Sequence, residues 1–429
     1  MKKIISLIIL FTPFAFLGAQ QTDSLSKLDK ILNHFDLEAY GVINYYHYNW
    51  ETWPEKRSAI DLERFTIEPI FKINKKIRII PEIEFEGGGT GATMDFDRFE
   101  EFGEFEIEIE KGGAVELEQF KIQFDVKPWL KFQVGKFKIP FSLVSSFPGP
   151  TSYVTTSFSE TEEELLPSEW AETGIEIYGA IDKKERFQYH IATVNGLDAT
   201  GFSSANWIKR GFQSRFETIN AENWALVGRF DYNFLKVDEE EKEEHEDISN
   251  GFIGISSYFG NSADNRPKPD LIVPAYVSIQ DFHFYINKNG ISNKTYFIYG
   301  HLKNSEAVTQ ANQNLSNNLN VKRTPVASDI LGVYTELGYD IFHNISKIQI
   351  KKKDLKLIVF GRLDYYDSMF KTRGEVFNNP RWERLSITSG INFNIFDKLT
   401  FKSQFTYRKL GTDALNIEKT FSTGIGFNI

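Results

Sequence analysis

Apolar and polar residues alternate along most of this chain. The pattern is clearest at 419–429, where Phe421, Ile425, Phe427 and Ile429 alternate with small or polar residues. A period of two is typical of a β-strand with one apolar face and one polar face. No segment shows helical spacing of comparable regularity. The pattern therefore predicts an all-β protein.

The same rule places sixteen strands along the chain. They are expected at 36–48, 61–73, 77–86, 115–126, 130–138, 173–181, 186–194, 223–234, 251–259, 276–287, 294–302, 330–340, 355–366, 385–396, 399–408 and 419–429.

The connections between these strands alternate between long and mostly short. The short ones include 74–76, 127–129, 182–185 and 397–398, and the long ones include 87–114, 139–172, 195–222 and 303–329. An even strand number, short periplasmic turns and long extracellular loops are typical of bacterial outer-membrane barrels. Counting 104–110 as a strand would destroy this alternation, so we expect it to form a local hairpin closed by Glu110–Gly113. The sequence thus predicts a transmembrane antiparallel β-barrel of about 16 strands.

The loop 303–329, rich in Asn and Gln, is expected to be mobile and extracellular.

Composition agrees with a barrel in a membrane. Aromatic residues make up 15% of the chain, yet the mean hydropathy is only −0.34. A transmembrane barrel has this balance because its outer face is apolar, its lumen is polar and its rims carry aromatic girdles. Outer-membrane lipid is therefore an expected partner.

The first residues resemble an export signal. Lys2 and Lys3 precede an apolar run from Ile4 to Leu17 that ends in Gly18-Ala19-Gln20. We expect residues 1–20 to be a signal peptide cleaved near Ala19 or Gln20, which predicts the outer membrane of a Gram-negative bacterium. Residues 21–35 are expected to form a short N-terminal leader or helix, and 36–429 the transmembrane β-barrel.

Several classes of chemistry find little support. The net charge of −10 disfavours a nucleic-acid partner, and the absence of cysteine excludes disulfides and thiolate metal sites. The seven histidines show no zinc-binding motif, and the acidic runs 160–164 and 238–247 lack the spacing of a calcium loop. We therefore expect no cofactor, no metal and no enzyme. The alternatives are an esterase-like or phospholipase-like barrel using His283 or His301, which lacks a Gly-x-Ser-x-Gly motif, and a purely structural barrel.

One segment carries a family resemblance. The run Gly135-Lys136-Phe137-Lys138-Ile139-Pro140-Phe141 resembles a segment of the phosphate-selective porin O and P family, as do Glu172–Ile175 and Arg362–Tyr366. In those sixteen-stranded, trimeric porins this segment ends the fifth strand and leads into a long third loop, which folds into the lumen and narrows it. The resemblance implies a Gram-negative porin, a homotrimer, and diffusion of small hydrophilic or anionic solutes such as phosphate. Here the fifth predicted strand ends at Lys138, and the longest predicted loop follows.

The expected pore-lining residues lie on the polar faces of the strands. Lys136 and Lys138 are spaced by two, so we expect both to face the lumen near its constriction and to favour anions. The other expected pore-lining residues are Glu82, Glu84, Arg229, Asp231, Arg362 and Asp364. The two Arg-x-Asp pairs either set up a transverse field that filters solutes or form salt bridges that stiffen the wall. The chain lacks the dense arginine series of the family's anion-selective members.

Overall fold

A computed structural model gives the architecture of the chain. It describes residues 34–96, 107–167, 169–213, 219–235, 250–266, 270–315, 323–344 and 355–429. The proposed signal peptide, most of the proposed leader and the acidic run 238–247 lie outside these ranges. No helix in the described part of the chain is long and apolar enough to cross a membrane.

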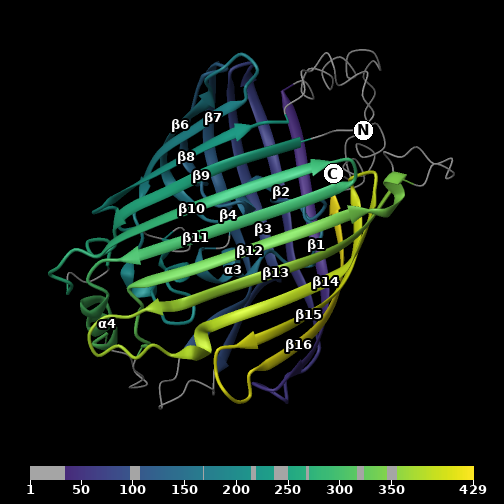
Figure 1. Cartoon of the computed structure of the whole chain (residues 1–429). Coiled ribbons are helices and arrows are strands. Elements are labelled where there is room, and N and C mark those ends of the chain that lie inside the picture. The colour runs from purple at the N-terminus through teal and green to yellow at the C-terminus, as the bar shows by residue number, and fades with distance from the viewer. Residues whose placement is uncertain are drawn as a thin grey trace, which may run out of the picture.

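Sixteen antiparallel strands close into one barrel, which Figure 1 shows from the side. They are β1 (Phe35–Trp50), β2 (Ala59–Asn74), β3 (Ile77–Phe96), β4 (Ile107–Lys127), β5 (Leu130–Lys138), β6 (Ala171–Ala180), β7 (Phe187–Asn195), β8 (Trp224–Asn233), β9 (Asn250–Asn261), β10 (Tyr276–Lys288), β11 (Ile291–Leu302), β12 (Asp329–Asp340), β13 (Leu355–Lys371), β14 (Glu383–Ile395), β15 (Leu399–Leu410) and β16 (Ile417–Asn428). Each strand pairs with its neighbours in sequence, and β1 pairs with β16 to close the ring. The predicted fold class and strand number are confirmed.

The largest difference from the predicted strand bounds concerns β3 and β4. Ile107–Glu110 do not close a separate hairpin but begin β4, where they pair with Thr93–Phe96 at the end of an extended β3. The two strands therefore continue as one hairpin beyond the predicted ends. Period-two alternation cannot reveal this, because a long strand and two short ones give the same pattern.

The barrel wall has an apolar outer face and a polar inner face. On β15 and β16, Phe401, Phe405 and Ile425 are exposed on the outside, whereas Gln404 and Ser422 are buried inside. This division follows from the pleat, which sends successive side chains to opposite faces. The apolar belt suits contact with lipid and the polar face lines the lumen.

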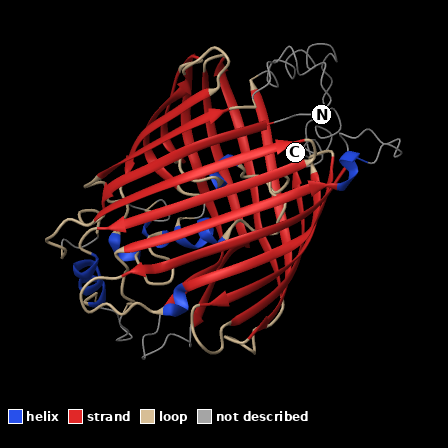
Figure 2. Ribbon diagram, in the orientation of Figure 1, coloured by secondary structure: helices blue, strands red, loops and turns tan. Residues whose placement is uncertain are grey.

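Short helices occupy the connections, and Figure 2 shows them inside and at the ends of the barrel. They are η3 (Val144–Ser146), α3 (Glu160–Leu165), η4 (Ala199–Gly201), η5 (Lys209–Gly211), α4 (Ser305–Gln313), η6 (Ile341–Asn344) and η7 (Pro380–Trp382). Helix α4 lies in the connection expected to be mobile, and its Asn312 is fully buried and accepts a hydrogen bond from Arg266 at 2.6 Å. That part of the connection is packed against its neighbours.

The connection between β5 and β6, residues 139–170, lies inside the barrel and is called the lumen loop below. Its Phe141, Leu165 and Trp170 belong to an apolar cluster that also includes residues of the connection between β7 and β8, such as Trp207, and inner-wall residues such as Tyr258. This cluster fills part of the lumen with close-packed side chains. The third-loop arrangement implied by the family resemblance is therefore present in this chain.

Candidate functional site: the lumen loop and its anchors

The first anchor of the lumen loop is Arg229 on the inner face of β8. Its Nη1 donates to the backbone carbonyl of Ser142 at 2.8 Å and to Oγ of Ser145 at 3.1 Å. Its Nη2 donates to Oγ of Ser146 at 2.9 Å. One wall arginine thus holds the first turn of the loop through three bonds, which the planar guanidinium can direct at once.

A buried chain of charged groups supports this anchor. Arg229 contacts Asp231 at 2.8 Å, and the other oxygen of Asp231 lies 2.6 Å from Nε2 of His283. Nδ1 of His283 lies 2.8 Å from Asp281, whose second oxygen accepts from the backbone N–H of Ser142 at 3.0 Å. These groups are almost fully buried. Each therefore bonds to a neighbouring group of the chain in place of water.

The second anchor is Arg362 on β13. Its guanidinium contacts Glu336 of β12 at 2.6 Å, and it donates to the carbonyl of Phe158 at 2.8 Å and to Thr155 at 2.6 Å. The ion pair of Arg362 is therefore with Glu336 and not with Asp364, two residues further along its own strand.

Asp364 holds the start of helix α3. Its carboxylate accepts from the backbone N–H groups of Glu160 at 2.8 Å and Thr161 at 3.2 Å. These N–H groups have no partner within the helix, and a negative charge is favoured at a helix N-terminus. Both Arg-x-Asp pairs thus fasten the lumen loop to the wall. This role adds to the two considered from the sequence, which were a transverse field and salt bridges that stiffen the wall.

A third anchor joins the end of the loop to β2, β3 and β5. Glu169 contacts Arg64 at 2.5 Å and Lys138 at 3.3 Å, and Lys138 contacts Glu82 at 3.0 Å. Burial alone would raise the pKa of Glu169, but the charges of Arg64 and Lys138 outweigh it and hold the pKa at about 2. Both cations therefore have carboxylates at contact distance.

Glu84 accepts from Thr66 at 2.8 Å and lies beside this third anchor. Carboxylate oxygens of Glu82, Glu84 and Glu169 lie within 4.8 Å of one another, a spacing that could suit a metal ion. Arg64 and Lys138 already supply two positive charges there, so a cation would meet repulsion as well as attraction. The cluster fits a structural ion-pair network better than a metal site.

The middle of the lumen loop crosses to β15 and β16. The backbone N–H of Thr156 donates to Gln404 at 2.9 Å, and its hydroxyl lies 2.9 Å from that of Ser422. The buried amine of Lys402 lies 3.5 Å from the ring centre of Tyr153, a cation–π contact. With the other anchors, these contacts bring the loop against strands on several sides of the ring.

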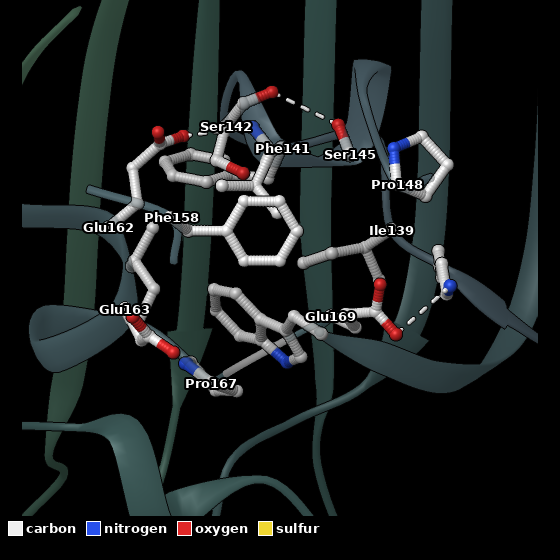
Figure 3. A pocket seen from close by; sticks show the side chains of 14 residues that line it. Ile139, Phe141, Ser142, Ser145, Pro148, Phe158, Glu162, Glu163, Pro167 and Glu169 are labelled. Atoms are coloured by element: carbon white, nitrogen blue, oxygen red, sulfur yellow. Dashed lines mark hydrogen bonds and ion pairs between the residues drawn. The ribbon is translucent and has the colours of Figure 1, made fainter. Parts of the chain in front are cut away.

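The loop has an apolar interior of its own, shown in Figure 3. Phe158 points to the centre of a small pocket whose lining includes Ile139 and Phe141. Glu162 lies at its edge and accepts from the backbone N–H groups of Leu143 at 2.7 Å and Val144 at 3.0 Å. The carboxylate thus ties the two halves of the loop together.

The structure separates the two lysines expected at a constriction. Lys138 joins the third anchor, whereas Lys136 pairs across the sheet with Phe120 and Thr173, whose side chains are exposed on the outer face. Nζ of Lys136 donates to the carbonyl of Leu117 at 2.7 Å. The spacing-by-two argument fails here because the pairing of β5 with β4 stops at Lys136, and the backbone N–H of Lys138 donates instead to the side chain of Gln119 at 3.2 Å.

An open cavity of ≈ 630 Å³, the short-turn cavity, lies between the wall and the lumen loop on the side of the short connections. Glu82, Lys138, Arg229 and Asp231 contribute to its lining. A second cavity, of ≈ 750 Å³, lies beside α4 on the side of the long connections. Of these two cavities, the short-turn cavity is the one that adjoins the lumen loop.

No family model matches the chain. Over 224 residues it is 25% identical to an uncharacterized protein of Aquifex aeolicus (strain VF5), a match that covers 52% of this chain and 45% of that protein. The chain thus matches less than half the length of that relative.

Among solved structures, OmpF of Salmonella typhi in complex with daunomycin gives a TM-score of 0.51 at 9% identity, over 92% of this chain and 97% of that one. OprB of Pseudomonas putida at low pH gives 0.50 at 9% identity, over 97% and 100%. An anion-selective porin from Comamonas acidovorans gives 0.50 at 8% identity, over 92% and 99%. This chain has the fold of an outer-membrane porin.

In this porin-fold chain, three anchor residues were not singled out from sequence: Glu169, Asp281 and Glu336. Asp281 stands two residues before His283 on β10, and Glu336 faces Arg362 across β12 and β13. Period-two spacing puts both on the polar face, but it gives no sign that they meet the loop. Glu169 lies in the loop itself, where no strand pattern applies.

Proposed function

We propose that this protein is an outer-membrane porin that lets small hydrophilic solutes diffuse passively. The observation that supports this most directly is a closed barrel whose polar inner wall borders an open cavity of ≈ 630 Å³ beside a loop fixed by salt bridges. A rigid loop across a wet lumen narrows it without needing a bound cofactor, and a sixteen-stranded barrel is wide enough for an aqueous channel.

Phosphate or general anion preference would follow from the family resemblance. Its support among the residues is weak, because Lys138 has Glu82 and Glu169 at contact distance and Lys136 pairs with outward-facing residues. We therefore leave the anion preference out of the proposal. We keep trimeric assembly in the proposal, and it rests on the family resemblance alone. A monomeric mass in mild detergent would contradict trimeric assembly.

An enzyme is the alternative class. His283 has an aspartate on each ring nitrogen and is fully buried, so it cannot reach a substrate as it stands. His301 bonds to Asp329 at 2.9 Å, but in the described ranges no serine hydroxyl bonds to its ring. A nucleophile within hydrogen-bond reach of its base is what a hydrolase would need.

Planar-bilayer recording on the purified, refolded full chain tests the proposal. We expect stepwise increases of conductance as channels insert. The barrel should also show a heat-dependent shift of its gel mobility and should fractionate with the outer membrane. Refolded barrels that insert without conducting would contradict the proposal, as would recovery from the soluble periplasm.

A further inference from the structure

The short-turn cavity carries more negative than positive charge. Five carboxylates contribute to its lining, those of Glu38, Glu68, Glu82, Glu176 and Asp231. Three basic side chains do so, those of Lys121, Lys138 and Arg229. The lining therefore has an excess of two negative charges when His190, bonded to Glu176 at 2.6 Å, is neutral.

Ion pairing cancels charges of both signs in the lining and leaves the excess of two negative charges unchanged. Lys138 contacts two carboxylates, Glu82 at 3.0 Å and Glu169 at 3.3 Å. Arg229 contacts Asp231 at 2.8 Å. A cation paired at contact distance contributes little to the potential a solute meets several ångströms away. The amine of Lys121 donates to the amide oxygen of Gln119 at 2.7 Å, and within the described ranges it is the one of these three cations with no carboxylate at salt-bridge distance.

Two carboxylates of the cavity have no such pairing. Glu38 on β1 lies directly opposite Glu68 on β2, and neither forms a salt bridge with any residue in the described ranges. Like charges that face each other across a sheet repel. The pair is tolerable beside open water, and its field extends into the cavity.

We infer that the short-turn cavity is a charge filter that favours cations over anions. The inference rests on the proposed diffusion function, and it concerns the sign of the field and not a cation-binding site. It is opposite to the selectivity that the family resemblance implies. Glu38 and Glu68 are the residues expected to contribute most, because within the described ranges neither has a cation at salt-bridge distance.

The reversal potential under a KCl gradient tests this, with the full chain in planar bilayers. The parent should reverse on the cation-selective side. E38Q combined with E68Q should shift the reversal potential towards anions. The shift should be larger in dilute salt, because the screening length falls from about 30 Å at 0.01 M to about 3 Å at 1 M. The matched control is E222Q with D413N, which removes two exposed carboxylates from the long connections.

Each outcome is decisive. A shift in E38Q/E68Q that the control lacks supports the inference. An anion-selective parent overturns it while leaving diffusion intact, and so does an unchanged reversal potential in an E38Q/E68Q barrel that shows the parent's heat-dependent gel shift. Folded parent barrels without conductance overturn the diffusion function and this inference together. E38K combined with E68K provides a second variant, and it should shift the reversal potential further in the same direction.

Discussion

Nη1 of Arg229, on strand β8, donates a 2.8 Å hydrogen bond to the backbone carbonyl of Ser142, the fourth residue of the lumen loop. The bond joins the barrel wall to a loop that enters its interior. On β13, Arg362 makes the equivalent bond to the carbonyl of Phe158 at 2.8 Å. Two inward arginines thus hold well-separated points of one loop.

Replacing Arg229 with glutamine should destabilise the barrel and loosen the loop. The change leaves Asp231 without its guanidinium partner in a buried site, where breaking such a pair costs about 3–5 kcal/mol. Chemical unfolding in detergent and the noise of the open-channel current should both report it. The control is R186Q: Arg186 bridges Asp182 at 3.1 Å but is 43% exposed, so its loss should cost about 0–1 kcal/mol. Equal effects of the two variants would contradict the anchoring role.

Gly254 on β9 leaves room for the buried chain of charges. A Cβ there would lie 2.0 Å from Oδ1 of Asp231 and 2.3 Å from Nε2 of His283, so these buried side chains must shift. We expect G254A to cost about 1–3 kcal/mol of unfolding free energy, as overpacking does. G228A is the control, because its Cβ would meet nothing nearer than 4.0 Å. Unfolding curves in detergent that coincide for both variants would refute the expectation.

Stability should depend on pH through Glu163 of α3. Burial raises the pKa of its carboxyl to about 7 from 4.5; Glu63 and Glu164 add to the rise and Lys209 opposes it. The folded protein keeps this proton while the unfolded chain loses it near pH 4.5, so this contribution falls as pH rises from 4.5 to 7. E163Q should therefore be more stable than the parent at pH 8, by about 1–3 kcal/mol. At pH 4 the unfolding free energies of E163Q and the parent should match. An equal difference between them at pH 4 and pH 8 would count against a pH dependence through Glu163.

Glu169 should show the opposite dependence. Its pKa of about 2 lies below the ordinary 4.5, because Arg64 and Lys138 outweigh the effect of burial. The carboxylate thus stabilises the fold above pH 4.5, and the contribution is lost as pH falls towards 2. E169Q should be destabilised by about 3 kcal/mol at pH 7 and by much less at pH 2.5. Denaturant midpoints measured across this range provide the comparison.

The orientation of the barrel in the membrane can be tested with peptide tags. The connection 411–416 joins β15 to β16 on the side of the long connections, and Asp413 in it is exposed. Lys184 lies in the short connection between β6 and β7, on the opposite side. A peptide tag after Asp413 should be detected by antibody on intact cells, and one after Lys184 only after permeabilisation. The reverse result would invert the assigned orientation.

The sequence by itself determined the barrel. Alternation with period two, as in 419–429, depends only on which side chains face lipid and which face water. That choice is made locally at each residue, so strand number, approximate bounds and the polarity of each face could be predicted. Connection lengths then fixed the even strand count. The extended β3–β4 hairpin was missed because alternation does not mark where pairing stops.

Only the tertiary structure decided what the inward residues do. Arg362 and Asp364 share a face in any extended strand, but Arg362 pairs with Glu336 while Asp364 holds the N-terminus of α3. Lys136 and Lys138 have the same spacing, yet they separate where the pairing of β5 with β4 stops. Contacts between a wall strand and a loop some 200 residues away depend on how the loop folds inside the ring. Periodicity carries no information about such pairs, since it records the face a residue occupies and not the partner it meets there.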